Sequence, residues 1–333
     1  MRVLLTGATG FLGRSVARHL VAHGHALRVL ARATSRTHGL PEGTETAIGD
    51  VTDAASLARA AEGCAAVVHT AALVKVWVPD PERFEATNLG GLRNALAAAR
   101  AAGARLVYTS SFIALGPSGA GELDASRPHP GPPYRNPYER TKALADAAAR
   151  EAAARGDDVV ILYPGVVYGP GDMTEGNMVV RMVADHLAGR LPGLVGPGDR
   201  RWSYAFVEDV AEGHALALEK ARPGDRFVLG GENATLQRLF ALVHELAGAK
   251  PPRLHIPYGV ASALGRAQWL WAELTGHPPQ LTHGEVFVFR EDWACDSSRA
   301  VRELGYEWRP LAEGLRETLR WLGSRPLPSG TAA

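Results

Sequence analysis

Short apolar runs and stretches of helical periodicity alternate along the first half of the chain. Runs typical of buried parallel strands occur near residues 2–6, 26–31, 44–48, 65–69, 104–109 and 158–163. Between them, apolar residues recur at helical spacing near 11–23, 53–62, 81–102 and 137–154. This alternation predicts an α/β fold built on a doubly wound parallel sheet.

The pattern becomes less regular beyond Pro164, where loops rich in glycine and proline interrupt it near 164–172 and 192–199. Helices are predicted near 176–189, 207–221, 234–248 and 310–322, with a short strand near 225–229. We therefore expect residues 165–324 to form a smaller, mainly substrate-binding portion, interleaved with the last elements of the sheet. Residues 325–333 are expected to form a flexible tail.

Two segments depart from the alternation. Residues 116–136 are rich in proline and glycine and predict a long loop, which in a compact domain is usually functional or mobile. Residues 258–275 are apolar, with Arg266 and Glu273 as interruptions. We expect this second segment to pack over a substrate pocket or in a dimer, and a helix lying in a membrane interface is the alternative.

Composition and charge exclude several classes of protein. Lys and Arg total 36 against 35 Asp and Glu, without a basic run, so no nucleic-acid partner is expected. No stretch of about 18 apolar residues is free of charge, so we expect no membrane span. Cys64 and Cys295 lack metal or redox spacing, the histidines form no metal motif, and the chain enters a strand at Arg2. These features favour a cytoplasmic protein without a signal peptide or a catalytic metal.

A glycine-rich turn joins the first expected strand to the first expected helix, with glycines at positions 7, 10 and 13. Glycines let the backbone approach a pyrophosphate, and the helix amino terminus supplies free N–H groups and positive potential. A P-loop is excluded because five residues separate Gly7 from Gly13 and Arg14 stands where lysine is needed. We therefore predict a dinucleotide-binding domain over 1–164; the alternative is a tight turn without a ligand.

The residues after the second expected strand bear on the choice of cofactor. Folds that bind NAD usually place an acid here for the ribose hydroxyls, but no acid lies between Gly24 and Glu42. Arg32, Ser35 and Arg36 are present instead, and a guanidinium suits the 2′-phosphate of NADP. We predict NADP(H), with NAD(H) as the second choice. The alternative is that both arginines are solvated loop residues.

Asp50 follows the third expected strand. Its carboxylate is a candidate acceptor for the adenine amino group, or else a helix N-cap or turn carboxylate. The sequence leaves both interpretations open.

Tyr138 and Lys142 lie four residues apart at the start of an expected helix, which places them on one face. Free tyrosine has a pKa of about 10 and is a poor base at neutral pH. A nearby ammonium and an oxidised nicotinamide both favour the phenolate, so Tyr138 is a candidate proton donor or acceptor for a carbonyl/alcohol pair. Ser110 and Ser111 end a strand at the carboxyl edge of the sheet, where a hydroxyl is a candidate to hold the substrate oxygen.

Together these motifs resemble those of the extended short-chain dehydrogenases/reductases, the NAD-dependent epimerase/dehydratase family, along the whole chain. The resemblance rests on the glycines at 7–13, Asp50, His69-Thr70-Ala71-Ala72, Asn88, the trio Ser111, Tyr138 and Lys142, residues 164–171, and Val207-Glu208-Asp209-Val210-Ala211. Arg32 and the region 296–306 further resemble the dihydroflavonol reductase and 3β-hydroxysteroid dehydrogenase-like branch.

The resemblance implies a Rossmann fold, hydride transfer at C4 of nicotinamide, a possible homodimer through two helices of one sheet face, and a role for each site residue. Tyr138 would act as general acid/base, and Lys142 would lower its pKa and hold the nicotinamide ribose. Ser111 would hold the carbonyl oxygen, and Asn88 would support the proton relay. The expected cofactor contacts are Gly7, Thr9, Gly10, Phe11, Leu12, Gly13, Arg32, Ser35, Arg36, Asp50, Val51, Ala71, Ala72, Thr109, Tyr138, Lys142, Pro164, Gly165 and Val167. The expected substrate contacts are Trp77, Ser111, Phe112, Tyr168 and Trp202.

One departure from the family concerns the substrate. Sugar-nucleotide epimerases usually carry an arginine for the substrate diphosphate seven residues before the position of Asp209, and this chain has Trp202 there. An indole cannot pair with a phosphate, but it can line an apolar pocket or belong to the core. Arg200 and Arg201 lie close by and keep the sugar-nucleotide alternative open.

We therefore expect an NADP(H)-dependent oxidoreductase that interconverts a ketone or aldehyde and an alcohol on a fairly apolar small molecule. The alternative is an NAD-dependent sugar-nucleotide epimerase or dehydratase, in which the hydride returns to the substrate. A non-catalytic cofactor sensor is a third interpretation, disfavoured because such proteins tend to lose the Tyr/Lys pair.

Overall fold

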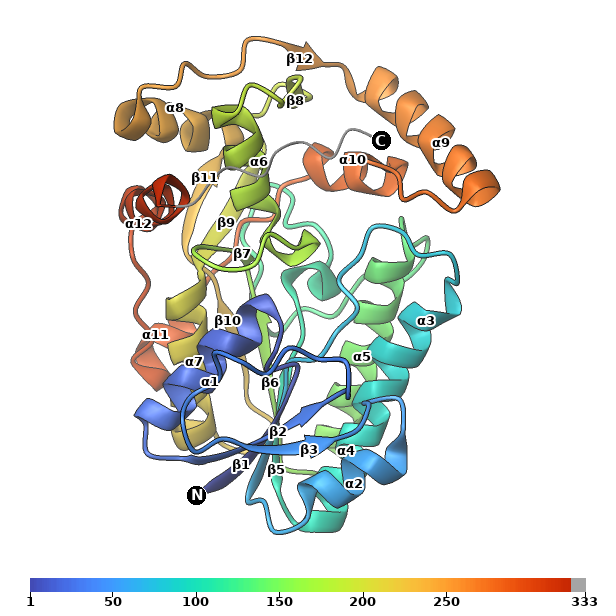
Figure 1. Ribbon diagram of the computed structural model, residues 1–333, viewed down its shortest axis with the longest axis vertical. Helices are drawn as coiled ribbons and strands as arrows, with labels where there is room; N and C mark the ends of the chain where they lie inside the picture. Colours follow the sequence, from blue (N-terminus) through green and yellow to red (C-terminus); the bar gives the residue numbers. More distant parts are fainter. Residues whose placement is uncertain (325–333) are drawn as a thin grey trace.

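The predicted apolar runs of the first half form the strands of one sheet in the computed structural model, which describes residues 1–324 (Figure 1). The six strands are β1 (Arg2–Thr6), β2 (Ala26–Ala31), β3 (Glu45–Ile48), β4 (Ala66–His69), β5 (Arg105–Thr109) and β6 (Val159–Pro164). With β10 (Arg226–Leu229) they pair in the order β10-β6-β5-β4-β1-β2-β3, and every pairing is parallel. The chain winds outward in both directions from β1, so the predicted doubly wound α/β fold is confirmed.

Helices cover both faces of this sheet (Figure 1). One face carries α1 (Phe11–Ala22), α7 (Val207–Lys220) and α11 (Ser298–Leu304), and the other carries α2 (Ala54–Ala61), α4 (Gly91–Ala102) and α5 (Pro137–Ala154). Successive strand residues point to opposite faces. Val3 and Leu5 of β1 therefore join the apolar cluster of α1 and α7, and Leu4 joins that of α2, α4 and α5.

The helix predicted over 81–102 is continuous but changes its winding. It begins as α3 (Glu82–Phe84), widens into the π-helix η1 (Glu85–Gly90), and continues as α4. Asn88 lies in the widened turn and is buried. Single π turns occur frequently at functional sites, and this one contains an expected site residue.

The remainder of the chain builds a smaller assembly beyond the carboxyl ends of the large sheet (Figure 1). Its strands are β7 (Val166–Tyr168), β9 (Arg201–Phe206) and β11 (Glu232–Thr235) in one sheet, and β8 (Leu194–Val195) with β12 (His255–Ile256) in another. Its helices are α6 (Met178–Leu187), α8 (Leu236–Ala247), α9 (Tyr258–Thr275), α10 (His283–Arg290) and α12 (Leu311–Gly323). Short 3-10 turns lie at η2 (Phe112–Leu115) and η3 (Glu175–Asn177).

The two parts of the chain are interleaved. α7, β10 and α11 belong to the large sheet or its helical layer although they follow the expected boundary at 164. β7 and β9, which lie in the chain between that boundary and α7, belong to the smaller assembly. The assignment of residues 165–324 to substrate binding stays a prediction. The predicted tail, 325–333, lies outside the described residues.

The long loop over 116–136 is held at several points. Leu123 exchanges backbone hydrogen bonds with Ala294 and Asp296, at 2.8 and 2.9 Å. Near its end, the carboxylate of Glu139 accepts from the backbone N–H of Arg135 and contacts the imidazole of His129. Burial alone would raise the pKa of Glu139, but these contacts outweigh it and lower the pKa. The loop is therefore pinned to the start of α5 and to the segment after α10.

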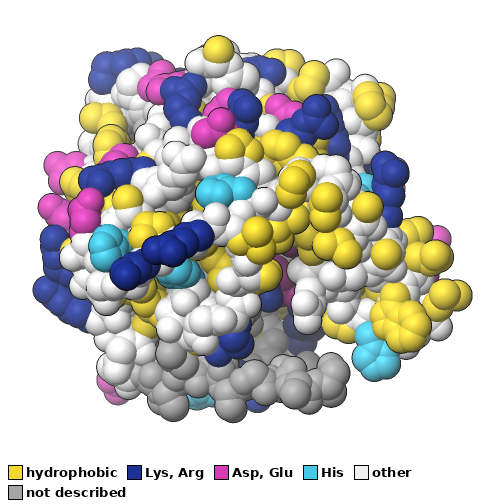
Figure 2. Space-filling model, turned by 90° about the horizontal axis from the view of Figure 1, so that it is seen from above, with side chains coloured by type: hydrophobic (Ala, Val, Ile, Leu, Met, Phe, Trp, Pro, Cys, Tyr) yellow, Lys and Arg dark blue, Asp and Glu magenta, His cyan; other side chains and the backbone are white. Residues whose placement is uncertain are grey.

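Helix α9 forms one margin of the molecule and packs against α10 (Figure 1). Hydrophobic side chains gather over this side of the top face in Figure 2. Within the described residues, no helix is both long and apolar enough to cross a membrane.

Candidate active site

The glycine-rich turn has room for backbone only. Gly7 has a positive φ of 76°, and a Cβ there would lie 2.7 Å from the backbone nitrogen of Ala71. A Cβ on Gly13 would lie 2.0 Å from the carbonyl oxygen of Gly7. Gly10 caps α1 without a side-chain hydrogen bond, and the first turn holds no acid. The N–H groups of that turn, including those at Phe11 and Leu12, are therefore suited to an anion, so the turn fits a dinucleotide pyrophosphate.

Two unpaired guanidinium groups follow β2. Arg32 and Arg36 are exposed, and neither guanidinium has a hydrogen bond or ion pair among residues 1–324. Arg14 of α1, by contrast, donates to the carbonyl oxygens of Arg36 at 3.0 Å and His38 at 2.8 Å. The backbone N–H of Ser35 donates to the carbonyl oxygen of Arg32 at 2.8 Å and closes a turn. These contacts with backbone groups fix the conformation of the loop, and the guanidinium groups of Arg32 and Arg36 stay free to bind a ligand.

The carboxylate of Asp50 closes a turn after β3. Its Oδ1 accepts from the backbone N–H of Thr52 at 2.9 Å and from the Thr52 hydroxyl at 2.8 Å. The N-cap of α2 is Asp53. Val51 accepts a hydrogen bond from the Asn94 side chain at 2.8 Å, which ties this corner to α4. In this structure Asp50 therefore acts as a turn carboxylate, and its contact with adenine stays a prediction.

Ser111 and Tyr138 meet at the carboxyl edge of the sheet. Ser111 follows β5 and caps η2, and its hydroxyl accepts from the backbone N–H of Ile113 at 3.4 Å. Tyr138 is the second residue of α5, whose N-cap Asn136 accepts from the Glu139 N–H at 2.8 Å. Burial raises the pKa of Tyr138 to about 12, and a side-chain hydrogen bond with Ser111 offsets part of that rise. The Tyr138 hydroxyl is therefore protonated at neutral pH.

Lys142 is buried one helical turn after Tyr138. Its ammonium donates to the carbonyl oxygen of Thr109 at 3.0 Å and lies 5.4 Å from the centre of the Tyr108 ring. Burial lowers the pKa of Lys142 to about 8, and the charge of Asp146 counters part of this shift. Burial is the main cause of the pKa of Tyr138 here, and the lowering of that pKa by the Lys142 ammonium, which the resemblance implies, stays a prediction.

Asn88 connects the site helix with the loop after β4. Its Nδ2 donates to the hydroxyl of Thr141 at 3.0 Å, and its Oδ1 accepts from the backbone N–H of Leu73 at 2.7 Å. Thr141 lies between Tyr138 and Lys142 in α5 and immediately precedes Lys142. Asn88 thus holds α5 against the loop from which Ala71 and Ala72 come, and its part in a proton relay stays a prediction.

The remaining cofactor candidates also follow strands of the large sheet. The hydroxyl of Thr109, the last residue of β5, lies 2.9 Å from Nε2 of His214. Pro164 ends β6, and the backbone N–H of Gly165 donates to Leu229 at 3.0 Å. Val167 continues into β7. The residues expected to hold the cofactor therefore gather at the carboxyl ends of β1 to β6, where chain direction changes and doubly wound folds bind nucleotides.

The expected substrate residues fall into two groups. Trp77 donates from Nε1 to Glu273 of α9 at 2.8 Å, and Phe112 meets Trp293 edge to face with ring centres 5.2 Å apart. Tyr168 is fully buried, and its hydroxyl donates to the carbonyl oxygen of Leu311 at 3.4 Å. The first group lies on connecting segments, and Tyr168 belongs to the packed interior of the smaller assembly.

Trp202 is buried in β9, with its ring 5.2 Å from that of Phe289. Its indole N–H has no hydrogen-bond partner among the described residues. The two arginines before it are engaged: Arg201 donates to the carbonyl oxygens of Ala120 and Gly121, and Arg200 pairs with Asp292 at 3.5 Å. The structure thus describes Trp202 as packed among aromatic rings, and its contact with a substrate stays a prediction.

Sequence reasoning missed several residues around the site. Trp293 and Phe289 come from the end of α10 and the segment after it, and they pack on Phe112 and Trp202. His214 of α7 contacts Thr109. No motif marks these positions, because their proximity arises only when distant segments meet. The buried Glu139 could have been noticed, since Asn136 and Glu139 have the spacing of a helix capping pair.

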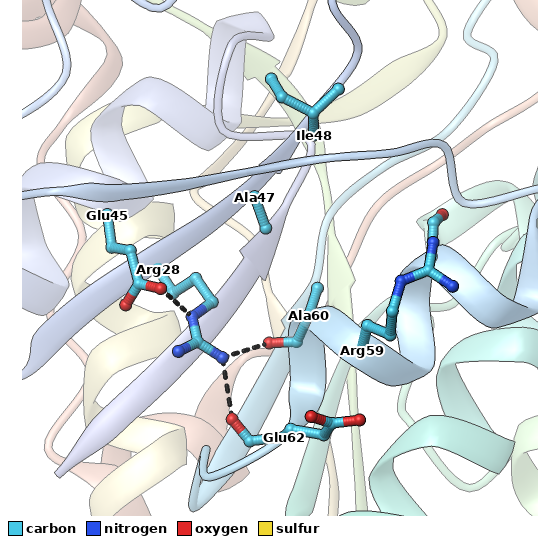
Figure 3. Close-up of a pocket in the computed structure, with 8 residues that line it drawn as sticks. Arg28, Glu45, Ala47, Ile48, Arg59, Ala60 and Glu62 are labelled. Atoms are coloured by element: carbon cyan, nitrogen blue, oxygen red, sulfur yellow. Dashed lines mark hydrogen bonds and ion pairs between the residues drawn. The ribbon is translucent and has the colours of Figure 1, made fainter.

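A separate pocket of about 320 Å³ lies between β3 and α2 at the edge of the large sheet (Figure 3). Arg28 dominates it, but its guanidinium is paired with Glu45 at 2.9 Å and donates to the carbonyl oxygens of Ala60 and Glu62. This arginine has little charge left for a ligand. Within residues 1–324, no group of three or more His, Cys, Asp or Glu side chains is arranged to hold a metal.

Comparison with known proteins agrees with the resemblance found in the sequence. A model described as the NAD dependent epimerase/dehydratase family matches residues 3–230. A Synechocystis sp. protein named provisionally as a dihydroflavonol 4-reductase is 32% identical, with 95% of this chain and 93% of that protein covered. A 3β-hydroxysteroid dehydrogenase/Δ5→4-isomerase of Mycobacterium tuberculosis is 30% identical, with 92% and 86% covered. The solved UDP-glucose 4-epimerase of Thermus thermophilus, in complex with NAD, is similar with a TM-score of 0.74 and 27% identity, over 97% of this chain and 99% of that one.

Proposed function

Because the chain belongs to the NAD-dependent epimerase/dehydratase family, and resembles its dihydroflavonol reductase and 3β-hydroxysteroid dehydrogenase-like branch, we propose that it is an NADP(H)-dependent oxidoreductase. It interconverts a ketone or aldehyde and an alcohol on a fairly apolar small molecule. The observation that carries this proposal is the side-chain hydrogen bond between Tyr138 and Ser111, with the buried Lys142 one helical turn after Tyr138.

The proposed chemistry divides between cofactor and chain. The nicotinamide, when bound, supplies or accepts the hydride. In reduction, the Tyr138 hydroxyl donates its proton to the carbonyl oxygen, since a pKa of about 12 keeps that proton in place at neutral pH. The Ser111 hydroxyl orients the substrate oxygen. The phenolate left on Tyr138 is stabilised by the ammonium of Lys142 on the same helical face.

The preference for NADP(H) rests on the loop after β2. Arg32 and Arg36 have no partner among residues 1–324, and an unpaired guanidinium is suited to a 2′-phosphate. No acid stands between Gly24 and Glu42 to accept the ribose hydroxyls in NAD. NAD(H) is the second choice.

The apolar character of the substrate rests on the aromatic surroundings of β9. Trp202 occupies the position where sugar-nucleotide epimerases usually carry a diphosphate-binding arginine, and Arg200 and Arg201 are engaged elsewhere. Phe112, the first residue of η2 after β5, adjoins Trp293. Rings of this kind bury apolar carbon well and give a diphosphate no partner.

The first test is a titration of the protein with NADPH and with NADH, followed by nicotinamide fluorescence, for the wild type and Arg32→Ala. We expect NADPH to bind at least about tenfold more tightly than NADH, a difference of about 1.4 kcal/mol. The Arg32→Ala variant should lose this difference, whereas Arg302→Ala, which removes an exposed arginine from α11, should keep it. Equal binding of NADH by the wild type would contradict the proposed preference.

A sugar-nucleotide epimerase or dehydratase is the second candidate, favoured by the likeness to the UDP-glucose 4-epimerase that was solved with NAD. It predicts that the purified protein retains NAD and that a UDP- or dTDP-sugar raises its melting temperature. Release of the dinucleotide on dilution, with no such shift, would set this candidate aside. A homodimer and a cytoplasmic location stay predictions of the sequence.

A further inference from the structure

Helix α9 buries small side chains and exposes large apolar ones, whereas a surface helix usually buries its large apolar side chains. The residues that it buries are small: Ala261, Gly265 and Ala272. A Cβ on Gly265 would lie 2.7 Å from the backbone nitrogen of His283, so α9 and the start of α10 approach closely. The large apolar side chains therefore point away from the body of the protein, and packing within this chain does not account for them.

These exposed side chains form one continuous stripe. Its residues recur at three- and four-residue spacing, which places them on one side of the helix: Val260, Ala263, Leu264, Ala267, Leu270, Trp271 and Leu274. Leu274 is 76% exposed and Trp271 is 63% exposed. Leu254, just before the helix, is 59% exposed. A patch of such side chains over one helix is larger than the isolated apolar residues found on ordinary surfaces, so it is a candidate interaction surface (Figure 2).

The charges beside the stripe are basic. Lys250, Arg253 and Arg266 are exposed, and none of their side chains has a hydrogen bond or ion pair among residues 1–324. From Leu246 to His283 the one acidic residue in the sequence is Glu273. Its carboxylate accepts the hydrogen bond of the Trp77 indole. The surface around α9 is therefore apolar, with three basic side chains on the helix and the segment before it against the one carboxylate of Glu273.

We propose that α9 docks this protein onto an anionic lipid bilayer. The helix lies in the plane of the interface, with the stripe, Trp271 included, at the boundary between headgroups and acyl chains. Lys250, Arg253 and Arg266 face the lipid phosphates. An apolar face with tryptophan and leucine, flanked by lysine and arginine, is the pattern by which helices bind membrane surfaces without crossing them. The docking does not depend on the proposed reaction.

A second copy of the chain fits this surface less well. Arg266 stands at the middle of the 18-residue helix. Two copies of α9 packed antiparallel about a two-fold axis would bring each Arg266 near that of its partner, and Glu273, the acidic side chain on the same flank, already accepts a hydrogen bond from Trp77. An anionic surface meets the same guanidinium favourably.

The docked helix would also lie against a segment of the candidate site. The hydrogen bond from Trp77 to Glu273 joins α9 to the loop that follows β4, and this loop also holds Ala71 and Ala72 at the cofactor edge. One loop of the large sheet thus carries both a contact with α9, at Trp77, and two of the expected cofactor residues.

Vesicle flotation tests the proposal with the full-length protein. Vesicles of phosphatidylcholine alone are compared with vesicles of equal parts phosphatidylcholine and phosphatidylglycerol. We expect the wild type to float with the anionic vesicles, with a blue shift of tryptophan fluorescence. Trp271→Glu/Leu274→Glu should reduce the bound fraction at least tenfold, and Arg253→Glu/Arg266→Glu should do so mainly at low salt. Trp308→Glu is the matched control, because Trp308 is also exposed, at 40%, but lies outside α9.

Sedimentation and a truncated variant distinguish docking on a bilayer from dimerisation and from binding through another segment. Absence of binding to anionic vesicles would overturn the proposal. So would a dimer that Trp271→Glu/Leu274→Glu converts to a monomer, since a second copy would then occupy the stripe. A variant that ends at Ser324 should bind vesicles as the full chain does, and loss of binding in that variant would also contradict docking through α9. Circular dichroism spectra unchanged from the wild type identify variants that remain folded.

Discussion

At the scale of single residues, burial shifts the pKa values of Tyr138 and Lys142, the two residues proposed to carry the acid–base chemistry. Burial pushes their pKa values apart, raising that of the phenol to about 12 and lowering that of the ammonium to about 8. The phenol remains a proton donor through the neutral range. The ammonium meets only the Thr109 carbonyl as a hydrogen-bond acceptor in the described part of the chain, and it retains donors for a further partner.

Replacing the phenol is the direct test of this role. We expect Tyr138→Phe to lower kcat for ketone reduction by about 10²- to 10⁴-fold, because a positioned proton donor contributes about that much. Binding of NADPH should change little. In the wild type, reduction should not lose its proton donor between pH 6 and 9, because the pKa of Tyr138 lies well above that range at about 12.

Tyr134→Phe is the control for that variant, since Tyr134 precedes α5 and packs beside His129. It should keep nearly full turnover. If Tyr138→Phe also turned over at the wild-type rate, the proton would have to come from another group.

Sequence reasoning performs unevenly among the candidate residues. Gly7, Gly13, Ser111, Tyr138 and Lys142 were identifiable because each occupies a fixed place relative to a strand end or helix start. Trp293 and Phe289 were not, because their contact with Phe112 and Trp202 depends on how a distant segment folds back. For Trp202 itself the sequence offered the pocket and the core equally, and an aromatic side chain in β9 is consistent with either.

At the scale of elements, two helices on one face of the sheet are joined by a ladder of imidazole and carboxylate groups. His19 of α1 contacts Glu208 and Glu212 of α7, and His23 contacts Glu212 and Glu219. Hydrogen bonding to Glu208 is the main reason that the pKa of His19 is raised. Burial opposes the shift at Glu208, but His19, Ser15 and Arg18 lower its pKa to about 2. These hydrogen bonds and ion pairs hold α1, the helix that follows the glycine-rich turn, against α7.

This ladder predicts a dependence of stability on pH. The contribution of His19 is fully present below pH 6.5 and is lost as pH rises through its raised folded-state pKa. That of Glu208 is present above pH 4.5 and is lost as pH falls toward about 2. His19→Asn should therefore lower the free energy of unfolding by roughly 1 kcal/mol at pH 6, and by less at pH 9.

Urea unfolding of both proteins at the two pH values measures this difference. His25, whose pKa is lowered chiefly by burial, works in the opposite direction but is present in both proteins. His244→Asn on exposed α8 serves as the control and should show no dependence of this kind. An equal loss for His19→Asn at pH 6 and pH 9 would show that the contact does not depend on the charge of the imidazole.

The elements themselves were predictable where a pattern repeats. β1 to β6 and β10 occur at the expected places because buried parallel strands are short apolar runs. β9 was missed although Trp202, Tyr204 and Phe206 recur at every second position of Arg201–Phe206, because the segment has no aliphatic run like those of the large sheet. β7 and β8 are only three and two residues long and depend on pairing with distant strands, so no local pattern marks them.

At the scale of the whole molecule, the candidate site lies where the large sheet meets the smaller assembly. Gly165 illustrates the closeness of the two, because a Cβ there would lie 2.7 Å from the carbonyl oxygen of Ser203 in β9. A ligand that contacts the ends of β1 to β6 on one side and β7 or β9 on the other would stabilise both parts together.

Thermal unfolding should report this joint stabilisation. With NADPH at about 100 times its Kd, the free energy of unfolding should rise by about 2.7 kcal/mol. The melting temperature should then rise by about 4 °C in a single transition, since the unfolding entropy grows with chain length. Arg32→Ala should reduce the rise at the same NADPH concentration. Two transitions, of which one responds to NADPH, would show instead that the parts unfold independently.

The path of the chain through β10 has a consequence for how such a protein can be altered. β10 pairs with β6 at the edge of the large sheet, yet it is reached only after the chain has built β7, α6 and β9 of the other part. A fragment that stops at 164 would leave β6 as a bare edge, with Ile161, Leu162 and Tyr163 unpaired on that side and open to another chain. The two parts therefore cannot be exchanged between relatives by a single cut. New specificity has to be introduced by replacing several separate segments while α7, β10 and α11 are kept.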